Sequence, residues 1–457
     1  MSVVLKFGGS SVADADCVRR VAAIAKSALD RGPMVVLSAM GKTTDKLFAA
    51  AQTAERGDRD GALLVSVDIF ANHSRACSDL WDDATPEPLT EFLEGARTQV
   101  EMLLRGVSLL RELSPRSRDA IVGFGELLSS QIVAAFLRSE GVQTTWLDAR
   151  RVMRTSAWFG EAEPQRDQIA ILARTELAPL VGSGRTVVTQ GYIGSTKDGT
   201  ATTLGRGGSD YSASIFGAAI GAEEVQIWTD VEGVLTADPR VVPEASPVLE
   251  LSFREAAELA AFGARVLHPA TIQPAVDADI PVTVRHTLRP AGKFSAITAK
   301  GGNGSARQVT AIASRGPIQV ITIESTRMLA HSGFLARIFE VFGRLGTSVD
   351  VVATAEVSVS LTVEANAPID AIRRELSAFA NVSVAPERAL VALVGERLKQ
   401  TPGLAARVFG ALSSVNVEMI SMGSNEINLS LVVEGKNEAT AVRLLHQALF
   451  ATKDAAA

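Results

Sequence analysis

Two glycine-rich segments constrain the fold of this 457-residue chain more than any other feature. They are Lys6-Phe7-Gly8-Gly9-Ser10 near the amino terminus and residues 203–210 in the middle, and each follows a strand pattern and precedes a helix pattern. Glycine lets backbone N–H groups approach an anion closely, and the helix start adds the positive end of its dipole. Each segment also carries a cation and a hydroxyl. The pair suits a phosphate donor beside an acidic acceptor, which predicts phosphoryl transfer.

The order of the predicted elements indicates a mainly parallel α/β fold. Strand patterns alternate with helix patterns up to about residue 291, as expected when helices cover a parallel sheet. Ligands of such sheets bind at the carboxyl ends of the strands. We expect strands at 3–6, 34–37, 143–148, 186–189 and 224–230, and helices at 13–29, 211–219 and 253–262.

An internal repeat follows the glycine-rich linker at 301–305. Shifting residues 333–364 by 70 positions onto 403–434 gives nine identities in 32 positions without a gap. Each copy has the pattern strand, helix, strand, strand, and a repeated supersecondary unit explains the match.

Composition excludes several classes of protein. The net charge of −6 argues against a nucleic-acid scaffold, and 47% hydrophobic with 21% charged residues is ordinary for a soluble globular protein. The two cysteines, Cys17 and Cys77, form no CxxC motif, so we expect neither a disulfide framework nor a protein-held metal. No apolar run approaches 18 residues and no signal sequence is evident, so we expect no membrane span and a cytoplasmic location.

Four side chains near the glycines are candidates for chemistry, and each has an ordinary alternative. Lys6 lies within reach of a phosphate at the first glycine turn, although a single lysine is most often solvated. Arg206 offers a carboxylate two parallel hydrogen bonds, which lysine does not. Asp210 can hold Lys6 or Arg206 in place or cap the following helix. Glu126 is either a capping carboxylate or a ligand for a substrate ammonium group.

Other nucleotide motifs are incomplete. Gly41-Lys42-Thr43 follows a strand, but Val36 occupies the position where a P-loop needs its first glycine. The small number of histidines does not oppose phosphoryl transfer, because a carboxylate nucleophile is already ionised and needs no strong base.

The motifs together resemble those of aspartate kinase, a member of the amino acid kinase superfamily, and the repeat resembles its paired ACT domains. In chain order they are Lys6-Phe7-Gly8-Gly9-Ser10-Ser11, Gly125-Glu126, Thr203-Leu204-Gly205-Arg206-Gly207-Gly208-Ser209-Asp210, Trp228-Thr229-Asp230, Asp238-Pro239-Arg240 and Gly263-Ala264-Arg265-Val266-Leu267-His268-Pro269. The resemblance covers nearly the whole chain. It favours the monofunctional form over the bifunctional one, because no homoserine dehydrogenase domain follows Glu434. Within the family the resemblance is to the lysine-sensitive type.

The resemblance implies an α/β/α sandwich of the carbamate kinase-like type with a mainly parallel sheet, followed by two ferredoxin-like ACT domains of βαββαβ topology. We expect the catalytic domain at residues 1–297 and a linker at 298–316 that includes a first strand shared with the second ACT unit. The ACT domains are expected at 317–386 and 387–457.

The implied reaction is ATP-dependent phosphorylation of L-aspartate to 4-phospho-L-aspartate, with Mg²⁺ carried by the nucleotide phosphates. Lys6 and Asp210 would be catalytic. The residues expected to bind aspartate are Thr44, Glu126, Arg206, Gly207, Gly208 and Ser209. The residues expected to face ATP are Lys6, Phe7, Gly8, Gly9, Thr229, Asp230, Leu235, Arg240, Arg265 and Val266. The family often has tyrosine at the position of Leu235 and lysine at that of Arg265.

The resemblance also implies feedback control of amino-acid biosynthesis by a regulatory amino acid, with lysine favoured over threonine, and a dimer or tetramer formed through the ACT domains. The expected effector residues are Met328, His331, Ser332, Gly333, Phe334, Leu335, Ser348, Val349, Ala355 and Glu356. Ala355 stands where a serine is expected, and Glu426 aligns with Glu356 as part of a degenerate second copy of the site.

Two other interpretations remain. The chain could be a different acid kinase, acting on glutamate or acetylglutamate, or an inactive kinase domain that senses amino acids. The ACT-like repeat and the order of residues 206–210 disfavour the first, and the presence of both Lys6 and Asp210 disfavours the second.

Overall fold

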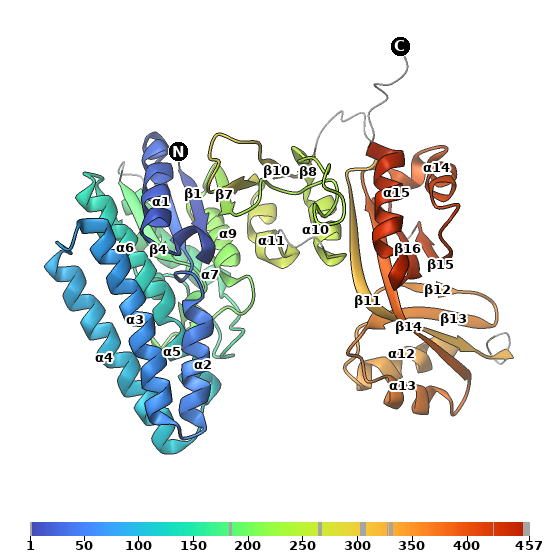
Figure 1. Cartoon of the computed structure of the whole chain (residues 1–457), viewed down its shortest axis with the longest axis horizontal. Helices are drawn as coiled ribbons and strands as arrows, with labels where there is room; N and C mark the ends of the chain where they lie inside the picture. The colour runs from blue at the N-terminus through green and yellow to red at the C-terminus, as the bar shows by residue number, and fades with distance from the viewer. Residues whose placement is uncertain are drawn as a thin grey trace, which may run out of the picture. The chain divides into compact units, whose positions relative to one another are not determined.

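The computed structural model describes residues 2–181, 185–263, 267–301, 308–326, 328, 332–423 and 425–450. The chain divides into two compact units, Met1–Val234 with Val266–Gly301 and Leu235–Arg265 with Gly302–Ala457. Figure 1 shows the elements of both units along the chain.

The first unit is built on a mainly parallel sheet with the strand order β3-β4-β2-β1-β7-β9-β10. All of the pairings in this series are parallel except β9 with β10. Every residue of β1, β2 and β4 is buried, as expected for strands covered on both faces, although β1 includes Lys6 and β4 includes two threonines and Gln190. The strands are β1 (Val3–Phe7), β2 (Pro33–Leu37), β3 (Thr144–Trp146), β4 (Thr186–Gln190), β7 (Glu224–Thr229), β9 (Val282–His286) and β10 (Ser295–Thr298).

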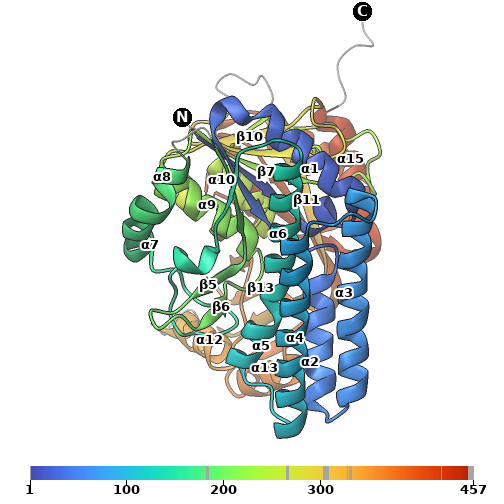
Figure 2. The ribbon, with the colours of Figure 1, turned by 90° about the vertical axis from the view of Figure 1, so that its left-hand side faces the viewer.

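Helices cover both faces of this sheet (Figure 1). One face carries α6, which packs on β2, β3 and β4, and the other carries α9, which packs on β1, β2 and β7. Three helices, α2 to α4, pack against one another and run side by side in Figure 2. The helices of this unit are α1 (Ala15–Ser27), α2 (Thr43–Glu55), α3 (Arg59–Trp81), α4 (Glu87–Leu110), α5 (Pro115–Val122), α6 (Phe124–Ser139), α7 (Arg166–Leu172), α8 (Ala178–Val181), α9 (Gly208–Ile220) and α11 (Pro269–Asp277).

A short antiparallel hairpin lies between β4 and α9 and was not predicted from the sequence. It consists of β5 (Ile193–Ser195) and β6 (Ala201–Thr203), and β6 leads directly into the second glycine-rich segment. Three residues per strand are too few for periodicity to identify.

One stretch of the described residues is long and apolar enough to span a membrane by length and composition alone. It runs from Pro115 to Ser139 and comprises α5 and α6, and its most apolar 18-residue window has a mean hydropathy of 1.7. The sequence analysis did not expect an apolar stretch of this length. Because 72% of its most apolar window is buried inside the protein, the stretch forms part of the core.

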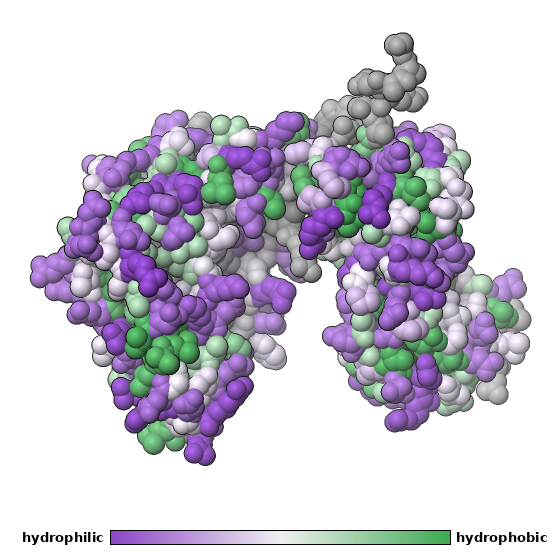
Figure 3. Space-filling view, viewed as in Figure 1, coloured by the Kyte–Doolittle hydropathy of each residue, from purple (hydrophilic) through white to green (hydrophobic). Residues whose placement is uncertain are grey.

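The outer surface of the long helices is mostly polar with separate apolar patches, as Figure 3 shows. The large apolar side chains exposed on α3 and α4 are Leu64, Val67, Met102, Leu109 and Leu110. Scattered exposure of this kind is normal for a protein surface.

The second unit contains an antiparallel sheet with the strand order β12-β13-β11-β14-β16-β15. Two clusters of buried apolar residues lie on it, one with α12 and α13 and one with α14 and α15. Its elements are β8 (Glu250–Ser252), α10 (Phe253–Ala261), β11 (Ala311–Glu324), α12 (Phe334–Arg344), β12 (Val352–Thr354), β13 (Ser358–Glu364), α13 (Ile369–Leu376), β14 (Asn381–Val394), α14 (Leu404–Ala411), β15 (Val417–Met422), β16 (Asn428–Glu434) and α15 (Glu438–Phe450).

The repeat predicted from the sequence matches these elements. The 70-residue offset superimposes β13 on β16, and Gly333 and Gly403 are the N-caps of α12 and α14 with φ of 86° and 79°. Such a backbone conformation favours glycine, so both copies retain it. Residues 311–315 of β11 pair with the end of β14, so the first strand of one half completes the other half.

Residues 235–265 pack within the second unit, although the sequence analysis assigns them to the catalytic domain. Glu258 of α10 accepts hydrogen bonds from the side-chain amides of Asn425 (2.7 Å) and Asn428 (2.9 Å). Thr236 Oγ1 lies 2.9 Å from Nε2 of His446. These bonds tie the inserted segment to the repeat.

Candidate active site

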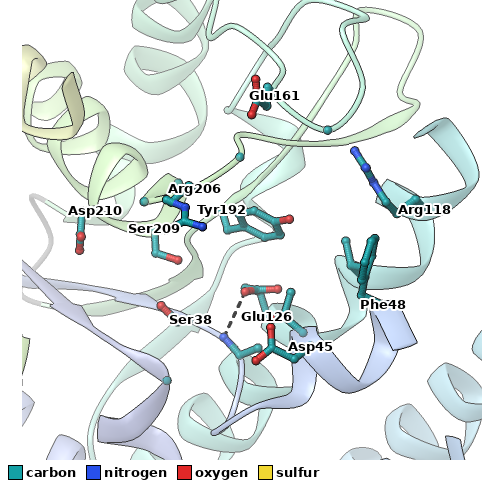
Figure 4. Close-up of a pocket in the computed structure, with 18 of the residues that line it drawn as sticks. Ser38, Asp45, Phe48, Arg118, Glu126, Glu161, Tyr192, Arg206, Ser209 and Asp210 are labelled. Carbon is teal, nitrogen blue, oxygen red and sulfur yellow. Dashed lines mark hydrogen bonds between the residues drawn. The ribbon is translucent and has the colours of Figure 1, made fainter. Parts of the chain in front are cut away.

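A cavity of about 980 Å³ lies in the first unit where β1, β2 and β4 end. Its wall is formed by the turns after these strands, the first residues of α2, α6 and α9, part of α5 and the loop at 158–161. Parallel strands bring their carboxyl ends to one edge of the sheet, where ligands bind. The cavity therefore lies where the sequence predicts a ligand site, and Figure 4 shows the side chains around it.

Lys6 and Asp210 form an ion pair at one end of the cavity, with Nζ 2.6 Å from Oδ1. Lys6 is 8% exposed on β1, which is flanked by β2 and β7. Asp210 lies in the first turn of α9, which begins at Gly208 rather than at Tyr211. The carboxylate thus pairs with Lys6 and is not the N-cap, a position taken by Gly207.

The first glycine turn leaves no room for a side chain at Gly9. A Cβ on Gly9 would lie 2.8 Å from the carbonyl oxygen of Gly41 and 3.0 Å from that of Ala39. A Cβ on Gly8 would lie 3.6 Å from the Lys6 ammonium. The backbone after β1 therefore lies directly beside the cation, which suits a close approach of phosphate oxygens. Phe7 is fully buried in the core.

The second glycine turn, at 205–209, begins α9. Gly205 and Gly207 have φ of 74° and 73°, a region that other residues adopt at a cost. Arg206 and Ser209 both line the cavity from this turn. Asp119 connects the strand before this turn to the loop at 158–161, because its carboxylate accepts hydrogen bonds from the backbone N–H of Thr203 (2.9 Å) and of Gly160 (2.8 Å).

Glu126 lies on the first turn of α6 and is almost completely buried. Oε1 accepts a hydrogen bond from the backbone of Ala39 (3.2 Å), while Oε2 has no hydrogen-bond partner in the described structure. Burial raises the pKa of this carboxyl to about 8, against the smaller opposing effects of hydrogen bonds from Ala39 and Thr44. A buried carboxyl with one unpartnered oxygen beside a cavity is suited to a cationic group. Thr44 of α2 lines the same cavity.

The residues expected to face the nucleotide are only partly brought together. Thr229 and Asp230 end β7, next to β1, and Thr229 Oγ1 donates to Asp230 (3.1 Å). Leu235 and Arg240 belong to the second unit. The Arg240 guanidinium pairs with Asp238 (2.5 Å) and is 76% exposed. Arg265 and Val266 lie outside the described residues.

The expected effector residues cluster around the start of α12 and the strands β12 and β13. Phe334 is buried in the core of the first repeat, whereas Leu335 is 41% exposed. Asp350, which directly follows the expected residues Ser348 and Val349, is a second carboxylate near this site and forms an ion pair with Arg315 (2.6 Å), while Glu356 is exposed and has no ion pair with a described residue. His331 lies outside the described residues. The remaining members, half-buried or exposed, are Met328, Ser332, Gly333, Ser348, Val349 and Ala355.

The structure adds cavity residues that the sequence analysis missed. Ser38 and Tyr192 follow β2 and β4, so the rule for carboxyl ends of strands could have identified them. Arg118 of α5 and Trp158 come from segments with no local motif, and only the fold brings them to the cavity.

Comparisons with known proteins agree with this geometry. The sequence model of the amino acid kinase family matches residues 1–286, and that of an ACT domain matches residues 391–449. Lysine-sensitive aspartokinase 3 of Escherichia coli (strain K12) is 40% identical over 461 residues, which cover 98% of this chain and 99% of that protein.

Two solved structures are similar over the same extent. E. coli aspartokinase III in complex with lysine and aspartate (T-state) has a TM-score of 0.81 at 40% identity and covers 98% of this chain and 99% of that chain. The same enzyme in complex with aspartate and ADP (R-state) has a TM-score of 0.81 at 39% identity, with coverage of 98% and 100%.

The parallel sheet and its two glycine turns, together with the family match, define an amino acid kinase domain, and the repeat after it forms ACT regulatory domains. This confirms the fold class predicted from the sequence. The relatives specify the family further: the chain belongs to the aspartokinase family.

Proposed function

We propose that this chain phosphorylates the side-chain carboxylate of L-aspartate with ATP, giving 4-phospho-L-aspartate and ADP. One observation carries the proposal: a single cavity has the Lys6–Asp210 pair beside a glycine turn and the buried, half-satisfied carboxyl of Glu126. The first group suits a transferring phosphoryl group, and the second suits the ammonium group of an amino acid. The E. coli relative binds aspartate and ADP, which supports the same substrates here.

In the proposed reaction a carboxylate oxygen of aspartate attacks the γ-phosphorus. The new O–P bond forms as the bond to the β-phosphate oxygen breaks, and the electron pair leaves with ADP. The chain's task is positioning and charge stabilisation, since the nucleophile is already ionised. Lys6 stabilises negative charge on the phosphoryl group, and Asp210 holds the Lys6 ammonium in place.

The remaining cavity residues bind the acceptor. Glu126 receives the ammonium group, Arg206 grips a carboxylate with two parallel hydrogen bonds, and Thr44 and Ser209 offer hydroxyls. The N–H groups of Gly207 and Gly208 at the start of α9 add the positive end of a helix dipole.

ATP is proposed to enter as its magnesium complex, with its phosphates at Phe7, Gly8 and Gly9 and its remaining contacts at Thr229, Asp230, Leu235, Arg240, Arg265 and Val266. No group of three or more described His, Cys, Asp or Glu residues is arranged to hold a metal ion. We therefore treat Mg²⁺ as part of the substrate rather than as a resident cofactor.

The test is ADP release by the purified chain over aspartate, glutamate, N-acetylglutamate and buffer alone, with hydroxylamine added to trap the acyl phosphate. Aspartate-dependent ADP release with hydroxamate formation is expected. Activity on glutamate or N-acetylglutamate alone would instead identify another acid kinase, and no activity with any of them would favour an amino-acid sensor.

We expect Arg206→Lys to raise the KM for aspartate by roughly tenfold with a smaller change in the KM for ATP, because lysine keeps the charge but not the bidentate geometry. Steady-state kinetics with each substrate varied in turn measure the two values. Equal weakening of both substrates would show that Arg206 supports the turn instead of binding the acceptor.

We also propose that lysine inhibits the enzyme through the ACT repeat. The E. coli relative is lysine-sensitive and binds lysine. In this chain Arg315 neutralises Asp350, so Glu356 is the exposed carboxylate of the expected site that remains suited to a lysine ammonium group. An inhibitor acts through its different affinities for the active and inactive arrangements.

Glu356→Ala is expected to raise the lysine concentration for half-inhibition about tenfold, since a charge-assisted contact is lost. Turnover without lysine should stay the same, because Glu356 lies in the second unit. Inhibition curves with lysine and threonine measure this. If lysine at millimolar concentration does not inhibit the unchanged enzyme, the effector assignment is wrong, and the serine hydroxyl absent at Ala355 is the first reason to examine.

We propose further that the protein is cytoplasmic and forms a homodimer or homotetramer. Exposed apolar side chains on the outer strands and on α12 support assembly through the repeat, among them Phe339 (39%), Ile420 (48%) and Met422 (39%). Light scattering with and without lysine tests the oligomer.

A further inference from the structure

Tyr192 occupies an unusual position in the cavity and has no role in the proposal above. It follows β4 and Gly191 and adopts a φ of 66°, in the left-handed region that non-glycine residues rarely adopt. Its ring packs against the core of the first unit and also lines the cavity. A strained backbone at a ligand site persists only where the surroundings hold it in place.

The surroundings of Tyr192 are the two ends of the second glycine turn. Its N–H donates to Ser212 Oγ (3.0 Å), which donates onward to the carbonyl oxygen of Gly208 (2.8 Å). Its own carbonyl accepts a hydrogen bond from the N–H of Leu204 (2.9 Å). A Cβ on Gly208 would lie 2.9 Å from Cδ2 of the Tyr192 ring. The ring is therefore held rigidly against the turn that binds the acceptor.

The cavity extends past this ring. Figure 4 shows Asp210 on one side of Tyr192 and Arg118 with Phe48 on the other, with Glu126 near the ring. We call the part of the cavity on the side of Phe48 and Arg118 the outer chamber. The whole cavity of about 980 Å³ is at the upper end for small-molecule sites and far exceeds what a four-carbon amino acid fills.

The two ends of the acceptor site are fixed by separate elements. The phosphoryl end is set by Lys6 on β1, and the ammonium end by Glu126 on α6. An amino acid with one more methylene, bound at both ends, must bend outward between them. The ring of Tyr192 lies near Glu126 (Figure 4) and against Gly208, so it borders both the ammonium end and the glycine turn of the acceptor site.

This inference rests on the proposed function. We infer that the ring of Tyr192 separates the acceptor site from the outer chamber and so limits the length of the amino acid that binds. Aspartate then fits, and glutamate, which is one methylene longer, is rejected. The aromatic ring performs this task and the hydroxyl does not. Burial raises the pKa of Tyr192, and the carboxyls of Glu126 and Asp119 raise it further while Thr203 and Arg118 oppose them, so the phenol stays neutral at neutral pH.

The experiment compares the full chain with Tyr192→Phe, Tyr192→Leu and Tyr192→Ala, using kcat/KM for aspartate and for glutamate. One methylene in an apolar pocket is worth on the order of 10- to 200-fold in selectivity. Tyr192→Phe should keep the aspartate-to-glutamate ratio, and Tyr192→Ala should lower it by about tenfold or more as glutamate turnover rises. Trp158→Ala, which removes another aromatic ring from the cavity wall, should leave the ratio unchanged.

The outcomes separate the two proposals. If the unchanged chain does not phosphorylate aspartate, the proposed function fails. If it does, but Tyr192→Ala lowers both substrates equally and keeps the ratio, Tyr192 is structural and the inference is wrong. Thermal unfolding shows whether each variant is folded. If Tyr192→Ala does not fold, Tyr192→Leu replaces it in the test, because leucine fills less space than the tyrosine ring. The aspartate-to-glutamate ratio of kcat/KM is then compared in the same way.

Discussion

Lys6→Ala is expected to reduce aspartate-dependent ADP release by a hundredfold or more, since one electrostatic contact to a charged transition state typically contributes about that much. Lys6 is held in place by its position in β1 between β2 and β7 and by its ion pair with Asp210. The KM for aspartate should change less than kcat. Initial rates over a matrix of both substrates separate these effects.

The same substitution also leaves Asp210 unpaired, and removing one member of a buried pair typically costs about 3–5 kcal/mol of stability. A loss of activity could then reflect unfolding. The double variant Lys6→Met with Asp210→Asn is the matched control, because it removes both charges while keeping the volume. It should unfold at a higher temperature than Lys6→Met alone yet remain inactive. Near-normal turnover in either folded variant would exclude Lys6 from catalysis.

Glu126 is expected to make aspartate binding depend on pH. With its pKa near 8, the carboxyl is protonated in the free enzyme at pH 7 and must ionise to pair with an ammonium group. The KM for aspartate should therefore fall about tenfold per unit as pH rises from 6 towards 8, and then level off. Glu126→Gln should abolish this dependence and raise the KM by roughly a hundredfold at pH 8. A KM that is constant between pH 6 and 8 in the unchanged enzyme would contradict this role.

A rise in pH is expected to lower the stability of the free protein through Glu126, although it improves aspartate binding. A carboxyl whose pKa is about 8 when folded and about 4.5 when unfolded binds more protons in the folded state between these values. Stability therefore falls as pH rises through that interval, by about 5 kcal/mol in total. Glu126→Gln should unfold at a higher temperature than the unchanged chain at pH 9 and at nearly the same temperature at pH 5. The variant would thus gain stability where it loses aspartate affinity.

The repeat and the glycine turns were predictable because their signals are local. Gly8 and Gly9 mark a strand-to-helix turn where a side chain on Gly9 does not fit, and Gly333 and Gly403 recur at equivalent helix starts. Lys6 follows from its place at the end of a strand. These residues report backbone conformation, which depends mainly on neighbours in the chain.

Other properties were not accessible from local patterns. The sequence left open whether Asp210 holds Lys6, holds Arg206 or caps the helix. The start of α9 at Gly208 places Asp210 within the helix, where it meets Lys6 from β1, more than 200 residues away in the sequence. The packing of residues 235–265 in the second unit depends on bonds such as those from Asn425 and Asn428 to Glu258. No motif near either partner indicates such a contact.

The sequence by itself determined the family, the mainly parallel sheet and the two glycine turns, because periodicity, turn chemistry and motif order are written along the chain. Only the tertiary structure decided how Glu126 and Tyr192 behave. Burial raises the pKa of Glu126, and the left-handed backbone of Tyr192 holds its ring inside the cavity. Both properties arise from the groups that surround a residue in space, and those groups come from strands and helices far apart in the sequence.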